Sequence, residues 1–407
     1  MAKNEQKPAI RFQGFTDAWE QRKLSALCDK FTDGDWIESK DQSDSGVRLV
    51  QTGNVGVAEY LDKPNNRKWI SDDTFARLHC EEVLPGDILI SRLPEPAGRA
   101  CIMPVLGTKM ITVVDCTIAK TTPDVSNKFL VQYLSSQAYF DAVNTCLAGG
   151  TRQRISRSNL AEFAVPIPSD KAEQEAVGSF FGNLDTLITL HQRKYDKLLS
   201  IKKSMLEKMF PRDGSKYPEI RFSGFTDPWE QRKLGHVFVE YSEKGHPELP
   251  ALTIIQGGGT VRRDESERSL QYDKASLVNY KMVNAEDFIV HLRSFEGGLE
   301  KATTLGIISP AYHTFHGEGT DSRFYYSYFR SKRFIEQDLK PHVYGIRDGR
   351  SIDIEGMKTI EIPWTSYTEQ QVIGNYIDTM DNLITLHQRK LEKLKNIKKS
   401  MLEKMFV

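Results

Sequence analysis

The segment EQEAVGSFFGNLDTLITLHQRKYDKLLSIKKSMLEKMF at residues 173–210 decides the fold, because it returns at residues 369–406 as EQQVIGNYIDTMDNLITLHQRKLEKLKNIKKSMLEKMF. Aligned without gaps, the two copies are identical at 24 of 38 positions. From Asn183 onwards the first copy has neither Pro nor Gly, and residues that favour helices dominate both copies. Each copy also follows an N-cap signature, with Asp170 or Ser366 three residues ahead of its first Glu. The sequence therefore predicts two helices, each about 55 Å long.

Apolar residues in these helices are spaced alternately by three and four, which indicates a stripe that packs on a partner helix. Two such helices in one chain most simply pack on each other. Seven Lys or Arg against two acids fall in the far half of each helix, a pattern most often found on a solvated face. The predicted seam, which is also the expected docking surface for partner subunits, contains Leu184, Leu187, His191, Leu198, Ile201 and Met205, and then Leu383, His387, Leu394, Ile397 and Met401.

A second repeat shows that the chain consists of two copies of one plan. PAIRFQGFTDAWEQRKL at residues 8–24 recurs as PEIRFSGFTDPWEQRKL at residues 218–234, with 14 of 17 positions identical. The segments between these opening motifs and the helices have almost no sequence in common. Constant edges suggest a shared task, such as holding the same partner twice, whereas divergent middles suggest two different targets. The predicted boundaries are 1–168 for the first recognition domain, 169–211 for the first spacer helix, 212–217 for a linker, 218–364 for the second recognition domain and 365–407 for the second spacer helix.

The two divergent middles have the pattern of mixed α/β modules, so the predicted fold class is α+β with an internal repeat. Helices are predicted at residues 128–144 and 325–339. Short β-rich runs bounded by turn residues predict strands at 47–51, 87–91, 111–114, 252–256, 288–291 and 359–362.

Composition narrows the class of protein. The 55 basic and 55 acidic residues cancel, so bulk charge does not indicate a nucleic-acid partner. Five cysteines, odd in number and without a CxxC spacing, indicate neither a disulfide framework nor a zinc site. The first residues lack an apolar signal core and no run approaches 18 apolar residues, so we expect a soluble cytoplasmic protein.

Motifs that carry catalysis are absent from the sequence. It has no Gly-Lys dipeptide for a Walker A loop, no GxGxxG and no HExxH. The run Gly257-Gly258-Gly259 reads as a turn, and His313 with His316 lacks the neighbouring ligands that a metal site needs. We therefore expect no catalytic residues and no bound metal.

Side chains suited to recognition recur at the same stations in both halves. Arg can donate two parallel hydrogen bonds to guanine, and Gln or Asn can do the same for adenine. For any single arginine a solvated or salt-bridged surface role is the more common alternative, and it is the recurrence that favours recognition. The predicted DNA-binding residues are Asn54, Arg92, Arg99, Thr151, Arg152, Gln153 and Arg154 in the first half, and Arg293, Ser294, Tyr344, Arg347 and Arg350 in the second.

These motifs together resemble the specificity subunit of type I restriction–modification systems. The resemblance rests on the opening motifs, on the Ile-Pro to Glu-Gln entry into each helix, on GDIL at residues 86–89 and on GIISPAY at residues 306–312, and it covers essentially the whole chain. It implies two target-recognition domains held apart by two antiparallel helices, each domain reading one half of a split double-stranded DNA sequence.

The resemblance also implies partners and cofactors. A specificity subunit is not an enzyme and binds no cofactor itself. It docks two modification (methyltransferase) subunits, which use S-adenosylmethionine to methylate adenine, and through them restriction subunits that use ATP and Mg. The neutral charge fits this arrangement if the modification subunits supply much of the phosphate contact.

Two other classes of function remain open from the residues alone. One is an intracellular scaffold whose two modules bind proteins, with the coiled coil as a spacer. The other is a DNA-processing enzyme whose active site has no recognised motif. A specificity subunit, unlike a scaffold, should bind DNA in a sequence-specific and salt-dependent way together with a modification partner. Methylation of DNA by the chain alone would favour the enzyme.

Overall fold

The computed structural model describes residues 7–149, 153–212, 214–266, 274–345 and 351–406. The chain forms two compact units: unit 1 comprises Met1–Gln192 with Arg389–Val407, and unit 2 comprises Arg193–Gln388. The two long helices, α5 (Lys171–Lys208) and α10 (Tyr367–Met405), are each shared between the units. The predicted boundaries treat each long helix as a segment of its own. In the structure, one part of each helix belongs to unit 1 and the other part to unit 2.

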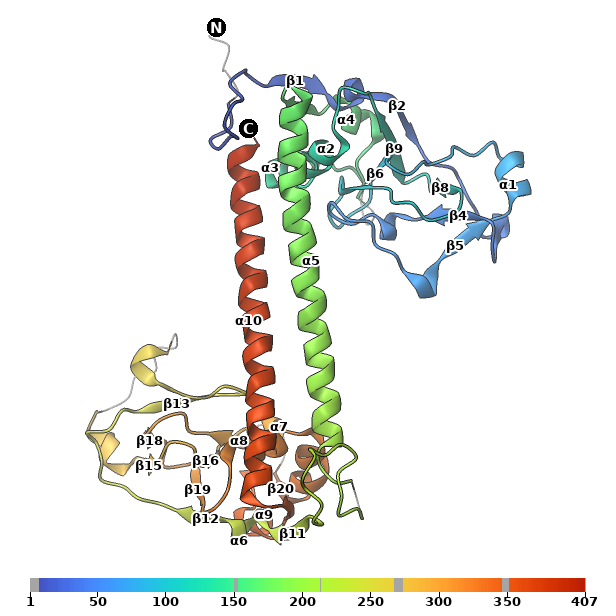
Figure 1. The fold of residues 1–407 in the computed structure, drawn as a ribbon. Coiled ribbons are helices and arrows are strands. Elements are labelled where there is room, and N and C mark those ends of the chain that lie inside the picture. Colours follow the sequence, from blue (N-terminus) through green and yellow to red (C-terminus); the bar gives the residue numbers. More distant parts are fainter. Residues whose placement is uncertain (1–6, 150–152, 213, 267–273, 346–350, 407) are drawn as a thin grey trace. The chain divides into compact units, whose positions relative to one another are not determined.

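Unit 1 contains two four-stranded sheets (Figure 1). The antiparallel sheet β2-β9-β6-β7 has its buried central strands β6 and β9 in the main core. The sheet β3-β5-β4-β8 includes one parallel pair, β4 with β8. The strands are β2 (Cys28–Asp33), β9 (Cys116–Thr121), β6 (Ile88–Ser91), β7 (Ala100–Ile102), β3 (Gln42–Ser43), β5 (Lys68–Ile70), β4 (Val47–Val50) and β8 (Met110–Thr112).

Short helices close the core of unit 1. The segment predicted as one helix at residues 128–144 forms two helices. Ser136 is the N-cap of the second helix, where its hydroxyl oxygen accepts a hydrogen bond from Tyr139 N. The helices are α1 (Asp72–Arg77), α2 (Asn127–Tyr133), α3 (Gln137–Thr145) and α4 (Arg157–Glu162).

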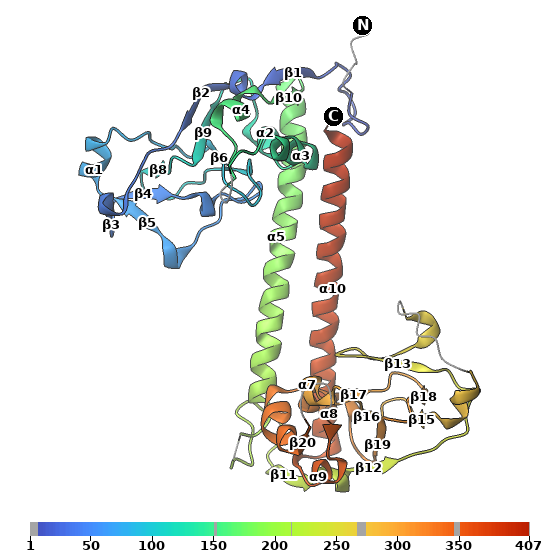
Figure 2. The same cartoon turned by 180° about the vertical axis from the view of Figure 1, so that it is seen from behind.

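Unit 2 contains one four-stranded antiparallel sheet, β12-β19-β16-β17, and several two-stranded ribbons (Figure 2). The predicted helix at residues 325–339 is split into α8 (Ser322–Phe329) and a π-helical turn at Phe334–Leu339. The strands of the sheet are β12 (Phe238–Tyr241), β19 (His313–Gly317), β16 (Phe288–Val290) and β17 (Glu300–Lys301). The ribbons are β13 (Leu252–Ile255) with β14 (Gly259–Arg262), β15 (Lys281–Val283) with β18 (Gly306–Ile308), and β20 (Val343–Tyr344) with β21 (Ser351–Ile352). The remaining helices are α6 (Leu234–Val237), α7 (Ser294–Gly297) and α9 (Ile354–Lys358).

The two opening motifs form equivalent strands. In unit 1, β1 (Glu20–Lys23) pairs antiparallel with β10 (Ala164–Ile167), the segment that leads into α5. In unit 2, β11 (Glu230–Lys233) pairs in the same way with β22 (Glu361–Trp364), which leads into α10. The Ile-Pro entry to each helix is thus part of a ribbon that the opening motif completes. The predicted α+β fold with an internal repeat is confirmed.

In each unit the α5 and α10 segments lie side by side and run in opposite directions (Figures 1 and 2). Asp185 Oδ1 and Lys398 Nζ form an ion pair of 2.5 Å in unit 1. Lys202 Nζ and Asp381 Oδ1 form an equivalent pair of 2.5 Å in unit 2. Asp185 corresponds to Asp381 in the repeat, and Lys202 to Lys398, so the same contact is made twice. The predicted antiparallel pairing is confirmed within each unit.

The seam between the helices differs in part from the predicted one. Leu187 and Leu383 are 43% and 39% exposed, and Ile201 is also exposed, so placing these three in the seam was wrong. The buried stripe runs instead through Ile384 and Leu391, which are 8% and 5% exposed. Both stripes are apolar because each LITL segment places its two leucines on one face of the helix and its isoleucine on the neighbouring face. Of the other predicted seam residues, Leu184 is buried, Met205, Leu394, Ile397 and Met401 pack against the cores, and His191, Leu198 and His387 are half-buried.

Among the described residues, no helix is long and apolar enough to span a membrane.

Candidate nucleic-acid interface

A buried glutamate in the first turn of each long helix anchors the opening motif. Arg11 donates from Nε and Nη2 to the two carboxylate oxygens of Glu173 at 2.6 and 2.7 Å, and Trp19 Nε1 donates to the same carboxylate at 3.2 Å. The Glu173 side chain is only 2% exposed, and its hydrogen bond raises the pKa of Arg11. Arg221, Trp229 and Glu369 repeat these contacts in unit 2, at 2.7, 2.8 and 3.1 Å. A two-pronged Arg–carboxylate contact is geometrically demanding. This demand explains why the opening motif and the start of the long helix are nearly the same in both repeats, while the segments between them differ.

The next residue of each helix ties it to its module. Gln174 accepts from Ser126 N at 2.8 Å and donates to Pro168 O at 2.8 Å. Gln370 accepts from Asp321 N at 3.0 Å and donates to Thr365 O at 2.8 Å. The Glu-Gln pair at the start of each helix is therefore a structural joint.

The far end of each helix fills an aromatic site next to the opposite anchor. In unit 1, the Phe406 ring lies 6.2 Å from Trp19 and 5.3 Å from Phe129, between ring centroids. In unit 2, the Phe210 ring lies 6.0 Å from Trp229 and 5.0 Å from Phe324. Trp19 and Trp229 are thus core and anchor residues.

In each unit, the segment after a central strand contacts a second segment close to other predicted DNA-binding residues. In unit 1, Ile155 N donates to Arg92 O at 3.1 Å, so the loop after β6 touches the connection between α3 and α4. In unit 2, α7, which follows β16, contacts β21 of the β20–β21 ribbon. In each unit, therefore, the segment that follows a central strand contacts a second segment that is distant in sequence.

Two of the predicted DNA-binding arginines hold these loops from inside. Arg99 donates to the backbone oxygens of Val55, Leu93, Pro96 and Thr52 at 2.6 to 2.9 Å and is 8% exposed. Arg92, also 8% exposed, donates to Val114 O at 2.6 Å and lies 3.5 Å from Asp33. With these donors engaged internally, the structure gives both arginines a structural role in place of the predicted base contact.

Asn54 and Ser294 are also structural. Asn54 is 3% exposed; its Oδ1 accepts from Gln51 N at 3.0 Å, and its Nδ2 donates to Leu61 O at 2.8 Å. Ser294 is fully buried and accepts from His291 N at 2.9 Å. A side chain that stabilises its own turn from a buried position has no free group for DNA.

Four predicted residues remain on the surface. Gln153 and Arg154 are exposed in unit 1, where Arg154 Nη1 lies 3.7 Å from Asp115 Oδ1. Arg293 is exposed in unit 2, and Tyr344 on β20 is 59% exposed. The other four predicted residues, Thr151, Arg152, Arg347 and Arg350, lie outside the described residues.

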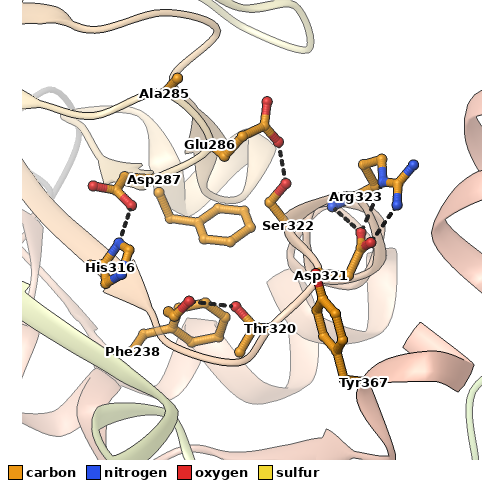
Figure 3. Close-up of a pocket in the computed structure, with 12 residues that line it drawn as sticks. Phe238, Ala285, Glu286, Asp287, His316, Thr320, Asp321, Ser322, Arg323 and Tyr367 are labelled. Atoms are coloured by element: carbon orange, nitrogen blue, oxygen red, sulfur yellow. Dashed lines mark hydrogen bonds and ion pairs between the residues drawn. The ribbon is translucent and has the colours of Figure 1, made fainter. Parts of the chain in front are cut away.

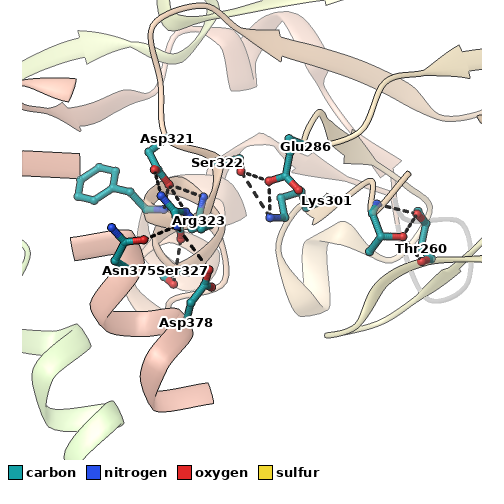
Figure 4. A network of polar contacts seen from close by, with 11 residues as sticks. Thr260, Glu286, Lys301, Asp321, Ser322, Arg323, Ser327, Asn375 and Asp378 are labelled. Atoms are coloured by element: carbon teal, nitrogen blue, oxygen red, sulfur yellow. Dashed lines mark hydrogen bonds and ion pairs between the residues drawn. The ribbon is translucent and has the colours of Figure 1, made fainter. Parts of the chain in front are cut away.

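An acidic hollow of 330 Å³ opens beside β16, β19 and the start of α8 in unit 2 (Figure 3). Asp287, with a side chain 4% exposed, accepts from Tyr241 Oη at 2.6 Å and pairs with His316 Nδ1 at 2.7 Å. Glu286 accepts from the Ser322 hydroxyl, and its carboxylate also pairs with a neighbouring lysine, as Figure 4 shows. The carboxylates of this hollow are engaged by internal donors.

The same region joins α8 to the long helix. Asp321 Oδ2 and Arg323 Nη2 form an ion pair of 2.5 Å, and Arg323 Nη1 donates to Asn375 Oδ1 of α10 at 2.5 Å (Figure 4). Asp378 Oδ2, also on α10, lies 3.7 Å from Arg323. The hollow is therefore part of a structural joint between module and helix.

Metal ligands do not cluster in the part of the chain that the structure describes, where no group of three or more His, Cys, Asp or Glu side chains could hold a metal ion. His313 pairs with Glu240 at 2.6 Å and His316 with Asp287, so these two histidines face different carboxylates.

Sequence reasoning missed Leu190 and Leu386, which are each 45% exposed. They lie one turn beyond Leu187 and Leu383 in the two identical LITL segments. The available signal was that each repeat carries more apolar residues than one helix seam can bury.

Comparison with known proteins agrees with this architecture. Residues 16–200 match the family model Methylase_S, described as the type I restriction modification DNA specificity domain. A specificity subunit of Methanocaldococcus jannaschii assigned to the type I restriction enzyme MjaX is 20% identical over 94% of this chain and 92% of its own length. The MjaVIII specificity subunit of the same organism is 23% identical over 61% of this chain and 62% of its own.

A solved structure shows the same fold. The crystal structure of the type I restriction–modification S subunit from M. genitalium superposes with a TM-score of 0.57, at 15% identity, over 98% of this chain and 99% of that one. The first half of the chain, residues 16–200, thus matches the type I restriction modification DNA specificity domain, and the chain as a whole resembles type I specificity subunits in sequence and fold.

Proposed function

We propose that each unit of this chain reads one half of a bipartite DNA target, and that the chain docks two copies of a modification subunit. The observation that carries the proposal is that one framework, with the same anchors, occurs twice and presents different loops at the same place. Equal frameworks suit equal partners, and unequal loops suit unequal half-sites. The chain itself performs no catalytic step in this proposal.

Base reading is assigned to the exposed loop residues of each unit. Exposed Gln, Arg and Tyr side chains, such as Gln153 and Arg154 in unit 1 and Arg293 and Tyr344 in unit 2, can reach base edges or phosphates. Buried Arg99 supports this function by holding its loop in one conformation. With 55 basic and 55 acidic residues, the chain relies on its partners for much of the phosphate contact.

Docking is assigned to the outward leucines of the long helices. Leu187 and Leu190 are exposed on α5 in unit 1, and Leu383 and Leu386 are exposed at the equivalent positions of α10 in unit 2. A large apolar side chain left in water at the same place in both repeats is typical of an interaction site. Two identical patches would hold two identical modification subunits. Those subunits would bring S-adenosylmethionine, and restriction subunits joined through them would bring ATP and Mg.

The reading of DNA is tested by selection from random duplexes. The complex of this chain with its modification subunits should enrich two defined half-sites separated by a gap of fixed length, with binding that weakens as salt rises. A protein-binding scaffold, the alternative function, would enrich no sequence. Enrichment of no motif, or of a single undivided motif, would contradict the proposal.

Substitution of the exposed leucines by aspartate tests whether they form the docking patches. Leu187→Asp together with Leu383→Asp should abolish assembly with modification subunits while both units stay folded, because each substitution places a carboxylate at an apolar contact. Either substitution alone should leave a complex with one modification subunit. Loss of a central contact of this kind costs about 2 kcal/mol or more of binding free energy.

A matched control comes from the same helix. Leu199 is 41% exposed on α5 but has Lys395 at its equivalent position, so it belongs to no repeated patch. Leu199→Asp should assemble with normal stoichiometry in native mass spectrometry. Normal assembly of the double variant, with unfolding temperatures unchanged in all variants, would remove the patches from the interface.

A further inference from the structure

The hairpin β13–β14 in unit 2 presents an exposed tip. It is a ribbon of two strands, and its turn is the glycine run that follows Gln256. Gly257 and Gly259 have φ values of +82° and +73°, which only glycine adopts without strain. Ile255 is 44% exposed at the end of β13, and Gln256 beside it is also exposed. The turn therefore presents an apolar side chain and an amide to the outside.

A buried carboxylate fixes the shape of this tip. Glu300, fully buried at the start of β17, accepts from Gly257 N at 2.7 Å and from Gly259 N at 3.1 Å. The same carboxylate accepts from Tyr326 Oη at 2.8 Å and forms an ion pair with Arg330. A turn held through two backbone amides by a buried ion pair is preorganised, so little order is lost when it binds a target.

The tip lies beside the loop that follows the central strand β16. A Cβ atom on Gly297, the last residue of α7, would collide with the side-chain amide of Gln256, so the two are in close contact. Arg293 directly precedes this four-residue helix, and Leu292 before it is 63% exposed. Within the residues that the structure describes, the Gln256 amide and the Arg293 guanidinium form no hydrogen bond or ion pair. One surface thus gathers two exposed apolar side chains and two exposed polar groups that can each make paired hydrogen bonds.

We infer that Ile255, Gln256, Leu292 and Arg293 form the base-reading surface of unit 2, with the hairpin tip inserted into the major groove of its half-site. This inference rests on the proposed function. The major groove admits a two-stranded ribbon, Gln pairs with adenine through two hydrogen bonds and Arg pairs with guanine in the same way. Ile255 and Leu292 suit the methyl group of thymine. The surface therefore reads a short sequence that contains adenine and guanine.

The corresponding place in unit 1 supports this reading. Strand β4 is followed by Gln51 and a turn at Thr52–Asn54, as β13 is followed by Gln256 and its glycine turn. Arg99, next to β7, holds that turn through the oxygens of Thr52 and Val55, whereas Glu300 of β17 holds the other turn through backbone amides. Arg99 and Glu300, which carry opposite charges, thus each fix a turn that follows a strand. Gln51 is half-buried and caps its own turn, whereas Gln256 is exposed.

Selection from random duplexes with the assembled complex tests the assignment. Gln256→Ala and Arg293→Ala should each lose the preference at one base pair of one half-site and keep every other preference. Affinity for the best wild-type duplex should fall roughly 10- to 100-fold, the effect of one two-pronged base contact. The matched control Gln388→Ala, which changes an exposed glutamine on α10, should retain the complete motif.

The outcomes separate this inference from the proposed function. If the wild-type complex enriches no bipartite motif, both fail. If it does, and Gln256→Ala and Arg293→Ala keep the complete motif at normal affinity, the assignment alone is overturned. An equal loss of affinity on all duplexes would mark the residues as phosphate contacts and would also overturn it. Circular dichroism and the unchanged second half-site show that the variants are folded.

Discussion

Removal of the Glu173 side chain should loosen the joint between the opening motif and α5. The carboxylate accepts three hydrogen bonds, from Arg11 Nε and Nη2 and from Trp19 Nε1, and is 2% exposed. Breaking one side of a buried ion pair costs about 3–5 kcal/mol. Because the Arg11 side chain is 14% exposed and can be partly solvated, we expect Glu173→Ala to cost about 3 kcal/mol. That is roughly a 100-fold rise in the population of the locally opened state.

Hydrogen exchange read by mass spectrometry measures this opening segment by segment. Peptides from residues 8–24 and from the start of α5 should lose protection in Glu173→Ala, whereas unit 2 serves as an internal control because its own anchor uses Glu369. The double variant Arg11→Met with Glu173→Met should lose less than the sum of the two single variants, since it leaves no unpaired charge. A change of less than about fivefold in protection, which corresponds to roughly 1 kcal/mol, would refute the reasoning.

Two further effects follow from charges within single units. Asp185→Lys should destabilise unit 1 by placing two lysines in contact at the helix seam, and adding Lys398→Asp should restore most of the loss; a double variant no more stable than the single one, in thermal unfolding, would contradict the pair. Glu243 and Glu248, whose carboxylates lie 2.8 and 3.2 Å from the ring nitrogens of His246, raise its pKa above the ordinary value of 6.5. The stabilisation by protonated His246 is therefore complete below about pH 6.5 and is lost as pH rises through the raised pKa; an NMR titration should show the raised value, and Glu243→Gln with Glu248→Gln should lower it.

The repeated edges of the chain were sufficient to predict the duplicated architecture and the pairing of the helices. Identity at Glu173 and Glu369, and at the arginines and tryptophans that contact them, reflects contacts that tolerate little change. The seam was harder to predict, because LITL places Leu187 on one face and Ile188 on the next, and periodicity alone does not tell which face meets the partner helix. Exposure resolves this, since Leu187 is 43% exposed and Ile384 is 8% exposed.

The candidate interface was predictable in location but not in detail. The sequence predicted recognition residues directly after β6 and β16, at Arg92 and Arg293, and the structure brings each of these segments into contact with a second segment of its unit. The sequence does not reveal that Arg99 donates only to backbone oxygens. A buried arginine and an exposed arginine cannot be distinguished by residue type and neighbouring residues alone. Gln256 was passed over because a glycine run reads as an ordinary turn unless the carboxylate of Glu300 that holds it is known.

The same backbone contact joins an opening motif to the end of a long helix in each unit. Ile10 N donates to Lys404 O at 3.0 Å in unit 1, and Ile220 N donates to Lys208 O at 3.0 Å in unit 2. Ile10 and Ile220 occupy the same place in the two opening motifs, and Lys404 and Lys208 occupy the same place in the two helices. In unit 2 the contact joins residues close in sequence, whereas in unit 1 it joins residues far apart in sequence. Docking of an opening motif on a helix end therefore does not depend on a direct chain connection between them, and the linker at residues 212–217 is not what specifies this contact.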